Sequence, residues 1–557
     1  MIAMSITCAC ASSAYAEINE RPRFDATYDD KVVLDYEWQI SPDEYTGAEK
    51  RKYTFNKGLT VSPNVSYTGN AIYLYRNIDV DFELGNGSEM NLESSGGALE
   101  VNTNSKLTIN GVNSNLYFGN KKWDEYNDAA TICMDEGSKL EINAGNLTTS
   151  GGAETNLKLF DNAQATINLT GNFTSDAGGT AIAMENDYRN SDTSLSIQAA
   201  NITLGTTDLE TAHRKAGLYL LAYKENGDNK LSFDLHAKDT LKISGFAKGI
   251  QTFGNALINL QGKTIIISAE SDSQGRGLSL NSYDAAKPSI LKAKAENLSI
   301  KGSEYAIYAN DRVDAQLNAT GDINISSSNY AISANKNTDI QLKSGQILNI
   351  LSDIWGIVSF DSTVNAQAEK AINIRGKVWT SGGHITVGKD SSTLQTVING
   401  DLTAKNNGYI TAFVNNAGSS FTGNTTDAHW QDVTTRDAGN KGIHLTLNGG
   451  SVWNDFDYDS TIQVLDTSKA KVDMQDDKFK GLFIGTLKGD KSTFNMDIDA
   501  STNTNNSDRL YIAGTHTGNH YITLNNVNAD GNTDGAAGTV LVSVKDEQGK
   551  FLANDKE

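Results

Sequence analysis

A short repeat constrains the fold of this chain more than any other feature of its sequence. A small residue and an apolar residue recur together, followed by a polar turn and by a segment in which apolar and polar residues alternate. The clearest copies begin at Tyr305, Tyr330 and Trp355, which are 25 residues apart. Alternation with a period of two indicates β-strands. A repeat of about 20 to 50 residues indicates a solenoid, a propeller or an array of small units.

Of these architectures, a parallel β-helix fits the repeat best. A propeller needs about 40 or more residues for each blade, and leucine-rich repeats need a stricter pattern of leucines. The Gly-Gly pairs of this chain lack the Gly-x-Asp pattern that follows in calcium-binding β-rolls. We therefore expect an all-β fold, a right-handed parallel β-helix with about 25 or more residues per coil. Ile, Leu, Val and Ala would fill its interior, and Asn, Gly, Asp and Ser would form its turns.

The ends of a β-helix expose an unpaired strand edge, so we expect a cap at each end. Residues 17–58 carry non-repetitive aromatic and charged sequence, which includes Tyr36, Trp38 and Tyr45. They are predicted to form the N-terminal cap. Residues 59–440 are predicted to form the coils of the β-helix, and residues 441–557 its closing region.

The first 16 residues, 1–16, resemble a signal peptide. They form an apolar run of small residues that closes with an Ala-Tyr-Ala sequence, which predicts cleavage between Ala16 and Glu17 and export of the remainder. No Lys or Arg precedes this run, although a positive segment normally opens a signal peptide. Lipidation of Cys10 is a weaker alternative, because Thr7 rather than Leu stands three residues before it.

Charge and cysteine content exclude several classes of function. The formal net charge is −21, which opposes binding to nucleic acid or to anionic lipid. Cys8 and Cys10 lie within the predicted signal peptide and Cys133 is the one cysteine after it, so no disulfide framework is expected. No long apolar run follows the signal peptide, so the sequence predicts no transmembrane helix.

The end of the chain carries the most specific patterns. A strand-like segment at residues 443–453, Ile-His-Leu-Thr-Leu-Asn-Gly-Gly-Ser-Val-Trp, is followed by further segments of this kind. These occupy residues 460–465, 487–499, 507–514 and 518–525. Together they resemble the closing region of the passengers of pertactin-like autotransporters, the proteins of type V secretion.

That resemblance implies that residues 441–557 form an autochaperone-like region, which folds first during export and templates the rest of the passenger. It also implies an outer-membrane translocator barrel as a partner, and a place at the bacterial cell surface or outside the cell. The alternating lipid-facing segments of about 10 residues that such a barrel needs are missing from this chain. We therefore expect a passenger that is truncated before its barrel, or one whose barrel is a separate chain.

Sequence motifs for catalysis or for metal binding are not found. The chain has no Gly-x-Ser-x-Gly nucleophile elbow. His516 and His520 are four residues apart, a spacing that shares a face only in a helix, and their segment has the pattern of turn and strand. The carboxylates of residues 455–459 and 473–477 could serve a glycosidase or lyase, but solvated turns explain them more simply. We expect no catalytic, metal or cofactor site and no enzyme activity.

Aromatic residues open the three clearest repeats. Tyr305, Tyr330 and Trp355 would stack into a ladder along one face if the 25-residue register holds. Such a ladder could bind carbohydrate with its flat rings, although packing between coils is the commoner role of such a row.

Adhesion is the function that we expect, through a host or matrix protein or a glycan ligand. A carbohydrate-active β-helix enzyme and a structural surface spacer are the two alternatives. A cleft with convergent carboxylates on adjacent coils would favour the enzyme, whereas exposed loops suffice for adhesion.

Overall fold

A computed structural model covers the chain. It describes residues 26–42, 50–63, 69–120, 130–151, 155–186, 192–206, 215–222, 230–269, 274–282, 287–432, 441–454, 457–499, 506–527 and 540–554. The predicted signal peptide, with its cleavage site between Ala16 and Glu17, lies outside these residues. The chain divides into two compact units, Met1–Ser299 (unit 1) and Ile300–Glu557 (unit 2).

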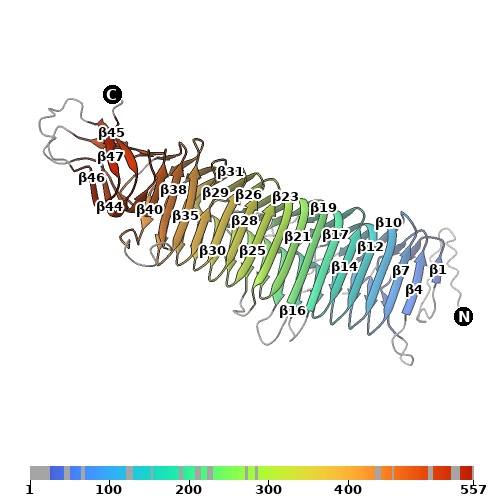
Figure 1. Cartoon of the computed structure of the whole chain (residues 1–557). Coiled ribbons are helices and arrows are strands. Elements are labelled where there is room, and N and C mark those ends of the chain that lie inside the picture. The colour runs from blue at the N-terminus through green and yellow to red at the C-terminus, as the bar shows by residue number, and fades with distance from the viewer. Residues whose placement is uncertain are drawn as a thin grey trace. The chain divides into compact units, whose positions relative to one another are not determined.

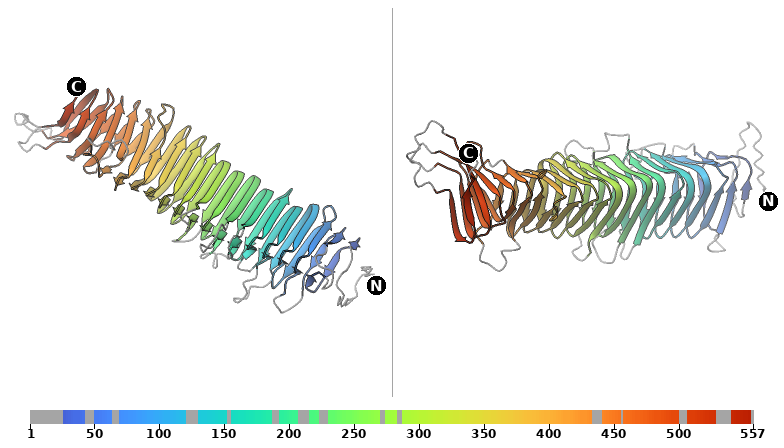
Figure 2. Two further views of the ribbon diagram at one scale, coloured as in Figure 1. Left: turned by 60° about the horizontal axis from the view of Figure 1, so that its bottom comes forward. Right: turned by 45° about the horizontal axis from the view of Figure 1, so that its top comes forward.

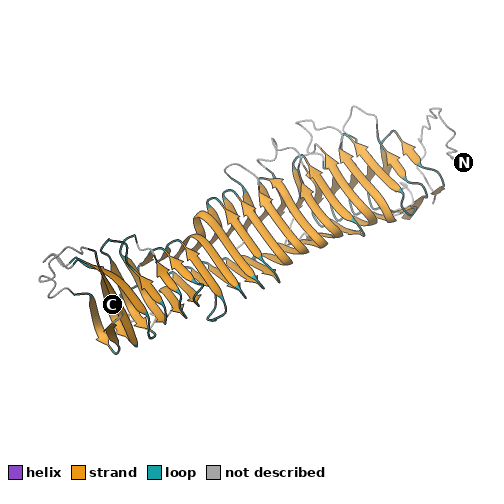
Figure 3. Ribbon diagram, turned by 90° about the horizontal axis from the view of Figure 1, so that it is seen from above, coloured by secondary structure: helices purple, strands orange, loops and turns teal. Residues whose placement is uncertain are grey.

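Every regular element in the described part of the chain is a β-strand (Figure 3). No helix is found there that could span a membrane. Successive coils pair through parallel strands in both units, for example β7 (Asp79–Leu84) with β10 (Lys106–Asn120) and β25 (Val313–Ala319) with β28 (Asp339–Ser344). The predicted all-β, parallel β-helix fold is confirmed.

The strands of unit 1 form three rows, and each coil adds to all three (Figures 1 and 2). Row A contains β3 (Trp38–Ile40), β6 (Ile72–Leu74), β9 (Leu99–Val101), β11 (Ile132–Met134), β13 (Thr155–Phe160), β16 (Thr180–Asn186), β18 (Ala216–Ala222), β20 (Lys248–Phe253) and β22 (Arg276–Asn281). Row B contains β1 (Ala26–Tyr28), β4 (Lys50–Phe55), β7 (Asp79–Leu84) and β14 (Gln164–Leu169). Row C contains β2 (Val32–Leu34), β5 (Leu59–Val61), β8 (Glu89–Ser94) and β15 (Asn172–Ala177). Long strands pass through row B and then row C: β10 (Lys106–Asn120), β12 (Lys139–Gly151), β17 (Asp192–Gly205), β19 (Lys230–Phe246) and β21 (Ala256–Ala269).

Unit 2 also begins with three rows, after β23 (Ser289–Gly302), which contains the boundary between the units. Row D contains β24 (Tyr305–Asn310), β27 (Tyr330–Asn335), β34 (Leu402–Lys405) and β37 (Thr425–Asp427). Row E contains β25 (Val313–Ala319), β28 (Asp339–Ser344), β30 (Thr363–Ala368), β32 (His384–Val387), β35 (Tyr409–Asn415), β38 (Gly442–Asn448), β40 (Ser460–Ser468), β42 (Gly481–Lys488), β44 (Arg509–His516) and β46 (Val542–Glu547). Row F contains β26 (Ile323–Ser327), β33 (Gln395–Asn399), β36 (Ser420–Thr422), β39 (Val452–Asn454), β41 (Lys471–Asp473), β43 (Thr493–Ile498), β45 (Asn519–Asn526) and β47 (Lys550–Ala553). Two long strands, β29 (Ile347–Phe360) and β31 (Ala371–Ser381), pass through row F and then row D. From β38 onward the described strands extend rows E and F, and the first residues of β40 also lie beside β37 of row D, where Thr461 Oγ1 accepts a hydrogen bond from the Asp427 N–H at 2.7 Å.

Inward side chains at equivalent positions of successive coils stack into ladders, and these ladders form the core of each unit. In unit 1 the backbone register aligns one such ladder along row A: Ile72, Leu99, Ile132, Leu157, Ile182, Leu218, Ile250 and Leu278. In unit 2 the corresponding ladder of row D is Ile307, Ile332, Ile357, Val378 and Leu402. All of these side chains are 0% exposed. Burying one such side chain stabilises the fold by roughly 1.5–3 kcal/mol, so the apolar residue of each repeat holds its coil in place.

The turns between rows use left-handed backbone angles, as their Asn and Asp content predicts. The pair Lys336 and Asn337, which follows β27, has φ angles of 52° and 60°. The Lys336 N–H donates a hydrogen bond to the Phe360 carbonyl of the next coil at 2.9 Å. This turn is therefore tied to the turn of the next coil, which helps to fix the side chains at this edge of row D.

The described strands of the predicted N-terminal cap, residues 17–58, form parallel pairs, one within the cap and two with the strands that follow it. Strand β1 pairs with β4, β2 with β5 and β3 with β6. The Trp38 ring contacts the rings of Tyr53, Phe55 and Phe82 with centroids 5.1, 6.3 and 5.5 Å apart. This segment thus forms a coil with an aromatic interior, and its role as a cap stays a prediction.

Candidate functional site

Three aromatic side chains lie at the same outward position on neighbouring strands of row D. The backbone register pairs Tyr305 with Tyr330, and Tyr330 with Trp355. The ring centroids of Tyr305 and Tyr330 are 4.7 Å apart with an interplanar angle of 14°. Those of Tyr330 and Trp355 are 6.1 Å apart with an angle of 5°. The rings are stacked along the row, in the order that their 25-residue spacing suggests.

Stacking decides which part of each ring a ligand can reach. Tyr330 has a parallel ring on each side, so both of its faces are covered. Tyr305 also contacts the ring of Tyr308 at 5.1 Å in an edge-to-face arrangement. In the next coil Lys377 takes the position of Trp355 and ends the aromatic row. This row presents mainly ring edges to the solvent, whereas a sugar ring needs an open aromatic face for stacking.

Beside the aromatic row lies a groove of about 680 Å³. Its floor is formed by Ser333 and Val358, which the register aligns between Tyr308 at one end and Trp379 at the other. The stacked rings form one wall. The opposite wall contains Asn310, Asn335 and Phe360.

Apolar surface is concentrated at one end of this groove. Phe360 is 43% exposed, and its ring centroid lies 4.5 Å from that of Trp379 in a tilted arrangement. Val358 on the floor beside them is buried. An exposed aromatic pair over an aliphatic floor is typical of sites that bind other proteins.

Tyr308, Phe360 and Trp379 were not identified from the sequence. Trp379 follows Trp355 by 24 residues, a spacing that suggests the same row, yet its register partner is Val358. The useful signal is the position within the repeat, because the first, fourth and sixth residues of β24 are less buried than the others. Aromatic residues at the fourth and sixth positions therefore belong to the same face as those at the first.

Charge is sparse in the groove. Among the described side chains that line it, Lys336 is the charged one, and its Nζ lies 3.4 Å from Asp311 Oδ1. The groove therefore offers apolar and amide contacts rather than an acid and a base. This composition suits binding and provides no pair of carboxylates for glycoside hydrolysis.

A second hollow in unit 2, of about 530 Å³, does contain two carboxylates. Asp339 opens β28, and Asp361 lies in the turn before Thr363, the register partner of Asp339 on the next coil. The Asp339 Oδ1 accepts a hydrogen bond from Gln341 Nε2 at 2.5 Å, and Asp361 is exposed. A glycosidase needs one carboxyl group in a dry, apolar setting, and neither side chain is buried.

The Asp-rich stretches noted in the sequence have structural roles where they are described; residues 455 and 456 lie outside the described part. The Asp459 Oδ1 accepts a hydrogen bond from the Gly481 N–H at 2.7 Å. The Asp476 Oδ2 lies 2.9 Å from Lys480 Nζ. These carboxylates accept a backbone hydrogen bond and form an ion pair, and they do not converge on a cleft.

Two fully buried carboxylates in the same region were not identified from the sequence. Asp497 Oδ2 accepts hydrogen bonds from the N–H groups of Asp476 and Asp477, at 2.9 and 2.8 Å. Asp508 accepts from the N–H groups of Lys480 at 2.9 Å and Asp497 at 2.6 Å. Burial raises the pKa of Asp508 to about 6. Both side chains connect the backbone of neighbouring coils, which is a structural role.

His516 and His520 lie together, although no helix joins them. His516 ends β44 and His520 lies in β45, and a tight turn with Gly518 at a φ of 85° brings their ring centroids to 5.4 Å. The expectation that their spacing shares a face only in a helix is therefore wrong. Burial lowers the pKa of both rings, that of His520 to about 4. Within the described residues, no group of three His, Cys, Asp or Glu side chains could hold a metal ion.

Comparisons with known proteins bear on the end of the chain most directly. The Pertactin family model matches residues 443–557, the region whose resemblance to pertactin-like passengers was predicted from the sequence. The crystal structure of the Haemophilus influenzae Hap adhesin matches with 14% sequence identity and a TM-score of 0.26. That match covers 93% of this chain and 61% of the Hap chain, so this chain spans less than two thirds of the Hap chain. No curated protein matches.

Proposed function

We propose that this chain is an exported autotransporter passenger that acts in adhesion at the cell surface or outside the cell, because residues 443–557 match the Pertactin family model. Its ligand is a protein of the host or of the extracellular matrix. The ligand binds in the groove beside Tyr305, Tyr330 and Trp355. An outer-membrane translocator is the partner in export.

The observation that carries this proposal is the exposed aromatic end of the groove. Tyr, Trp and Phe are enriched at the centres of protein interfaces, where they supply most of the binding energy. Phe360 and Trp379 form such a pair, and the stacked row beside them is a rigid wall. A preformed wall lowers the entropic cost of binding. A protein ligand is favoured over a glycan because the face-to-face stacking leaves few open ring faces.

Binding to immobilised matrix proteins tests the proposal. The chain is measured against collagen, fibronectin and laminin, as wild type and as Trp379→Ala. Trp430→Ala is the matched control, because Trp430 is also partly exposed and contacts Phe483 at 5.3 Å outside the groove lining. We expect Trp379→Ala to weaken binding about 10-fold or more and the control to change it less than about 2-fold. Equal binding by wild type and Trp379→Ala would refute the role of the groove.

Polysaccharide degradation is a second candidate function, and the hollow with Asp339 and Asp361 is the observation that favours it. Release of reducing ends from polysaccharides is measured for the wild type and for a variant with Asp339→Asn and Asp361→Asn. Release that disappears in the double variant would support the enzyme. If the chain is an adhesin without catalytic activity, the wild type should release no reducing ends.

A further inference from the structure

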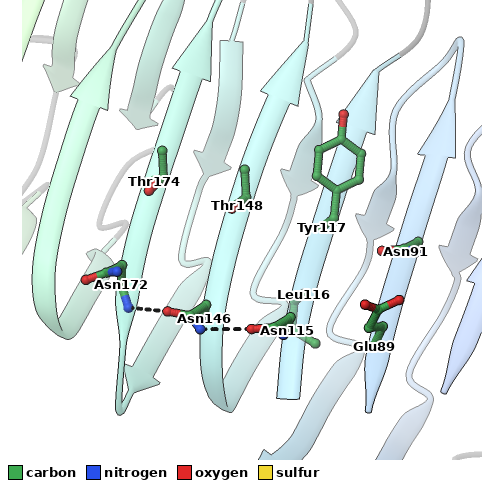
Figure 4. A pocket seen from close by; sticks show the side chains of 9 residues that line it. All are labelled: Glu89, Asn91, Asn115, Leu116, Tyr117, Asn146, Thr148, Asn172 and Thr174. Carbon is green, nitrogen blue, oxygen red and sulfur yellow. Dashed lines mark hydrogen bonds between the residues drawn. The ribbon is translucent and has the colours of Figure 1, made fainter. Parts of the chain in front are cut away.

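The outer face of row C in unit 1 carries a row of fixed amide side chains. The register aligns Glu89, Asn115 and Asn146 on successive coils, and Asn172 follows on the next coil, directly before Phe173, the register partner of Leu147. Asn146 Nδ2 donates a hydrogen bond to Asn115 Oδ1 at 2.8 Å, and Asn146 Oδ1 accepts one from the Asn172 N–H at 2.7 Å (Figure 4). These amides are held in one orientation before any ligand arrives.

Tyr117 lies beside this row and covers a glycine. A Cβ atom built on Gly119 would lie 2.9 Å from Tyr117 Cε1 and 3.0 Å from its hydroxyl oxygen. The ring therefore lies along its own strand, over the backbone of Gly119. Figure 4 shows both the ring and the strands face-on, so the ring lies roughly parallel to the sheet. Tyr117 is partly exposed and lines a hollow in this face, and in the described part of the chain no other aromatic ring is stacked on it.

Hydrogen-bonding groups surround this open ring face. Asn91 and Thr148 are the register neighbours of Tyr117 on the two adjacent coils, and Thr174 lies one coil further. Together with the amide row they line a hollow of about 540 Å³. A flat aromatic face next to amide and hydroxyl groups matches a pyranose ring, which has an apolar face of C–H groups and hydroxyls at its rim.

Acidic side chains surround the same site and limit the kind of sugar. Glu89 is exposed, Glu93 is the register partner of Gly119, and Asp176 lies in the same outer row. Lys31 Nζ is 3.8 Å from Glu89 Oε2 and offsets part of one charge. Like charges across a binding site oppose association, so a uronic or sialic acid is disfavoured here.

We propose that Tyr117 forms the platform of a second binding site, in unit 1, for a neutral or amino sugar within an oligosaccharide. The sugar ring stacks on Tyr117, and its hydroxyls bind to Asn91, Thr148 and the amide row. This site shares no residue with the groove of unit 2 and stands whether or not that groove binds a protein.

Titration of the chain with three oligosaccharides tests the proposal: cellotetraose, tetra-N-acetylchitotetraose and tetragalacturonate. We expect the two uncharged probes to bind the wild type, and Tyr117→Ala to weaken that binding about 10-fold, since an aromatic contact contributes on the order of 1 kcal/mol or more. Tyr117→Phe keeps the ring face and should stay within about 3-fold of the wild type. Gly119→Val tests the geometry without removing the ring, because a side chain at position 119 would occupy the place of the Tyr117 ring. It should weaken binding about 10-fold, as Tyr117→Ala does.

Tyr219→Ala is the matched control, since Tyr219 is a partly exposed tyrosine of row A that contacts Phe253 at 6.0 Å. It should bind as the wild type does. Glu89→Gln should strengthen binding of tetragalacturonate if the acidic side chains exclude it. Thermal unfolding confirms that each variant folds, and if Tyr117→Ala does not fold, the contrast between Tyr117→Phe and Gly119→Val decides. The proposal is overturned if neither uncharged probe binds, if tetragalacturonate binds the wild type equally well, or if Gly119→Val binds as the wild type.

Discussion

Tyr330 in unit 2 lies between two parallel rings, whereas Tyr117 in unit 1 lies over a glycine. Both are outward tyrosines on a parallel β-face whose coils are spaced about 4.8 Å apart. In unit 2 the adjacent coils carry Tyr305 and Trp355 at the same position, so the ring faces are used in packing. The neighbours of Tyr117 are Asn91 and Thr148, which leave a face open. What an aromatic residue offers to a ligand thus depends on the residue one coil away.

Truncation of the two tyrosines should separate these roles most strongly. Tyr330→Ala removes a ring that stacks on two others, and we expect it to lower the free energy of unfolding by about 2–3 kcal/mol. Tyr117→Ala removes a ring that packs on one side only, and it should cost less than about 1 kcal/mol. Urea unfolding of both variants measures the difference. Equal costs would show that the stacked row is no more structural than the lone ring.

The amide row of unit 1 gives a second, smaller test of the same comparison. Asn146→Ala removes the bond to Asn115 and the bond from Asn172, and we expect a loss of about 1–2 kcal/mol. Thr148→Ala, two residues along the same strand, should cost under about 0.5 kcal/mol and serves as its control. If both variants unfold at the same urea concentration, the ladder of amides does not stabilise this face.

Protonation of His520 should cost about 1 kcal/mol of stability in acid. Burial lowers the pKa of His520 to about 4, and the neighbouring His516 acts in the same direction while Asp490 opposes it. Burial also lowers the pKa of His516, against the opposing charge of Glu547. The unfolded chain takes up this proton near pH 6.5, so stability is lost as the pH falls from about 6.5 toward 4. Asp508 has the opposite effect. Because burial raises its pKa to about 6, its protonation in the folded chain increases the free energy of unfolding as the pH falls below about 6. We expect His520→Phe to reduce the loss measured between pH 7 and pH 5.5 by about 1 kcal/mol.

Hydrogen exchange, corrected for its intrinsic pH dependence, locates this effect. Strands β44 to β47 should lose protection at pH 5.5, and the strands of row C should not, because the described histidine of unit 1, His236, is exposed. Equal losses in the two regions would contradict the role assigned to the histidine pair.

Sequence reasoning predicted the coil and the row of stacked rings because both follow from periodicity. A residue repeated every 25 positions must align with its copies when the coil has that length, as Tyr305, Tyr330 and Trp355 do. Residues 443–525 resemble pertactin-like passengers in their local patterns, and the Pertactin family model matches the same region.

One coil of the core could not be recognised from the repeat pattern, because a polar residue replaces the small residue of the repeat. Leu157 continues the ladder from Ile132, yet the residue before it is Asn156, which is fully buried. Its Nδ2 donates to Ser175 Oγ at 2.9 Å and its Oδ1 accepts from Thr131 Oγ1 at 3.3 Å. A buried amide with such partners is compatible with a core position, but those partners come from other coils and cannot be read from a linear pattern.

The proposed binding surfaces could not be predicted from the sequence for a related reason. The groove combines Phe360 with Trp379, and the sugar site combines Tyr117 with Asn91, in each case from strands of different coils. Insertions of unequal length between coils hide these alignments in the sequence. The orientation of Tyr117 depends on the absence of a side chain at Gly119, a contact two residues away that no repeat predicts.

Hydrogen exchange of the chain with and without a bound matrix protein tests the proposed adhesive groove most directly. We predict slower exchange in Tyr305–Asn310 and Tyr330–Asn335, with no change in Glu89–Ser94, and loss of this protection in Trp379→Ala but not in Trp430→Ala. If the bound protein does not slow exchange in β24 and β27, and Trp379→Ala binds as the wild type does, the proposal is contradicted.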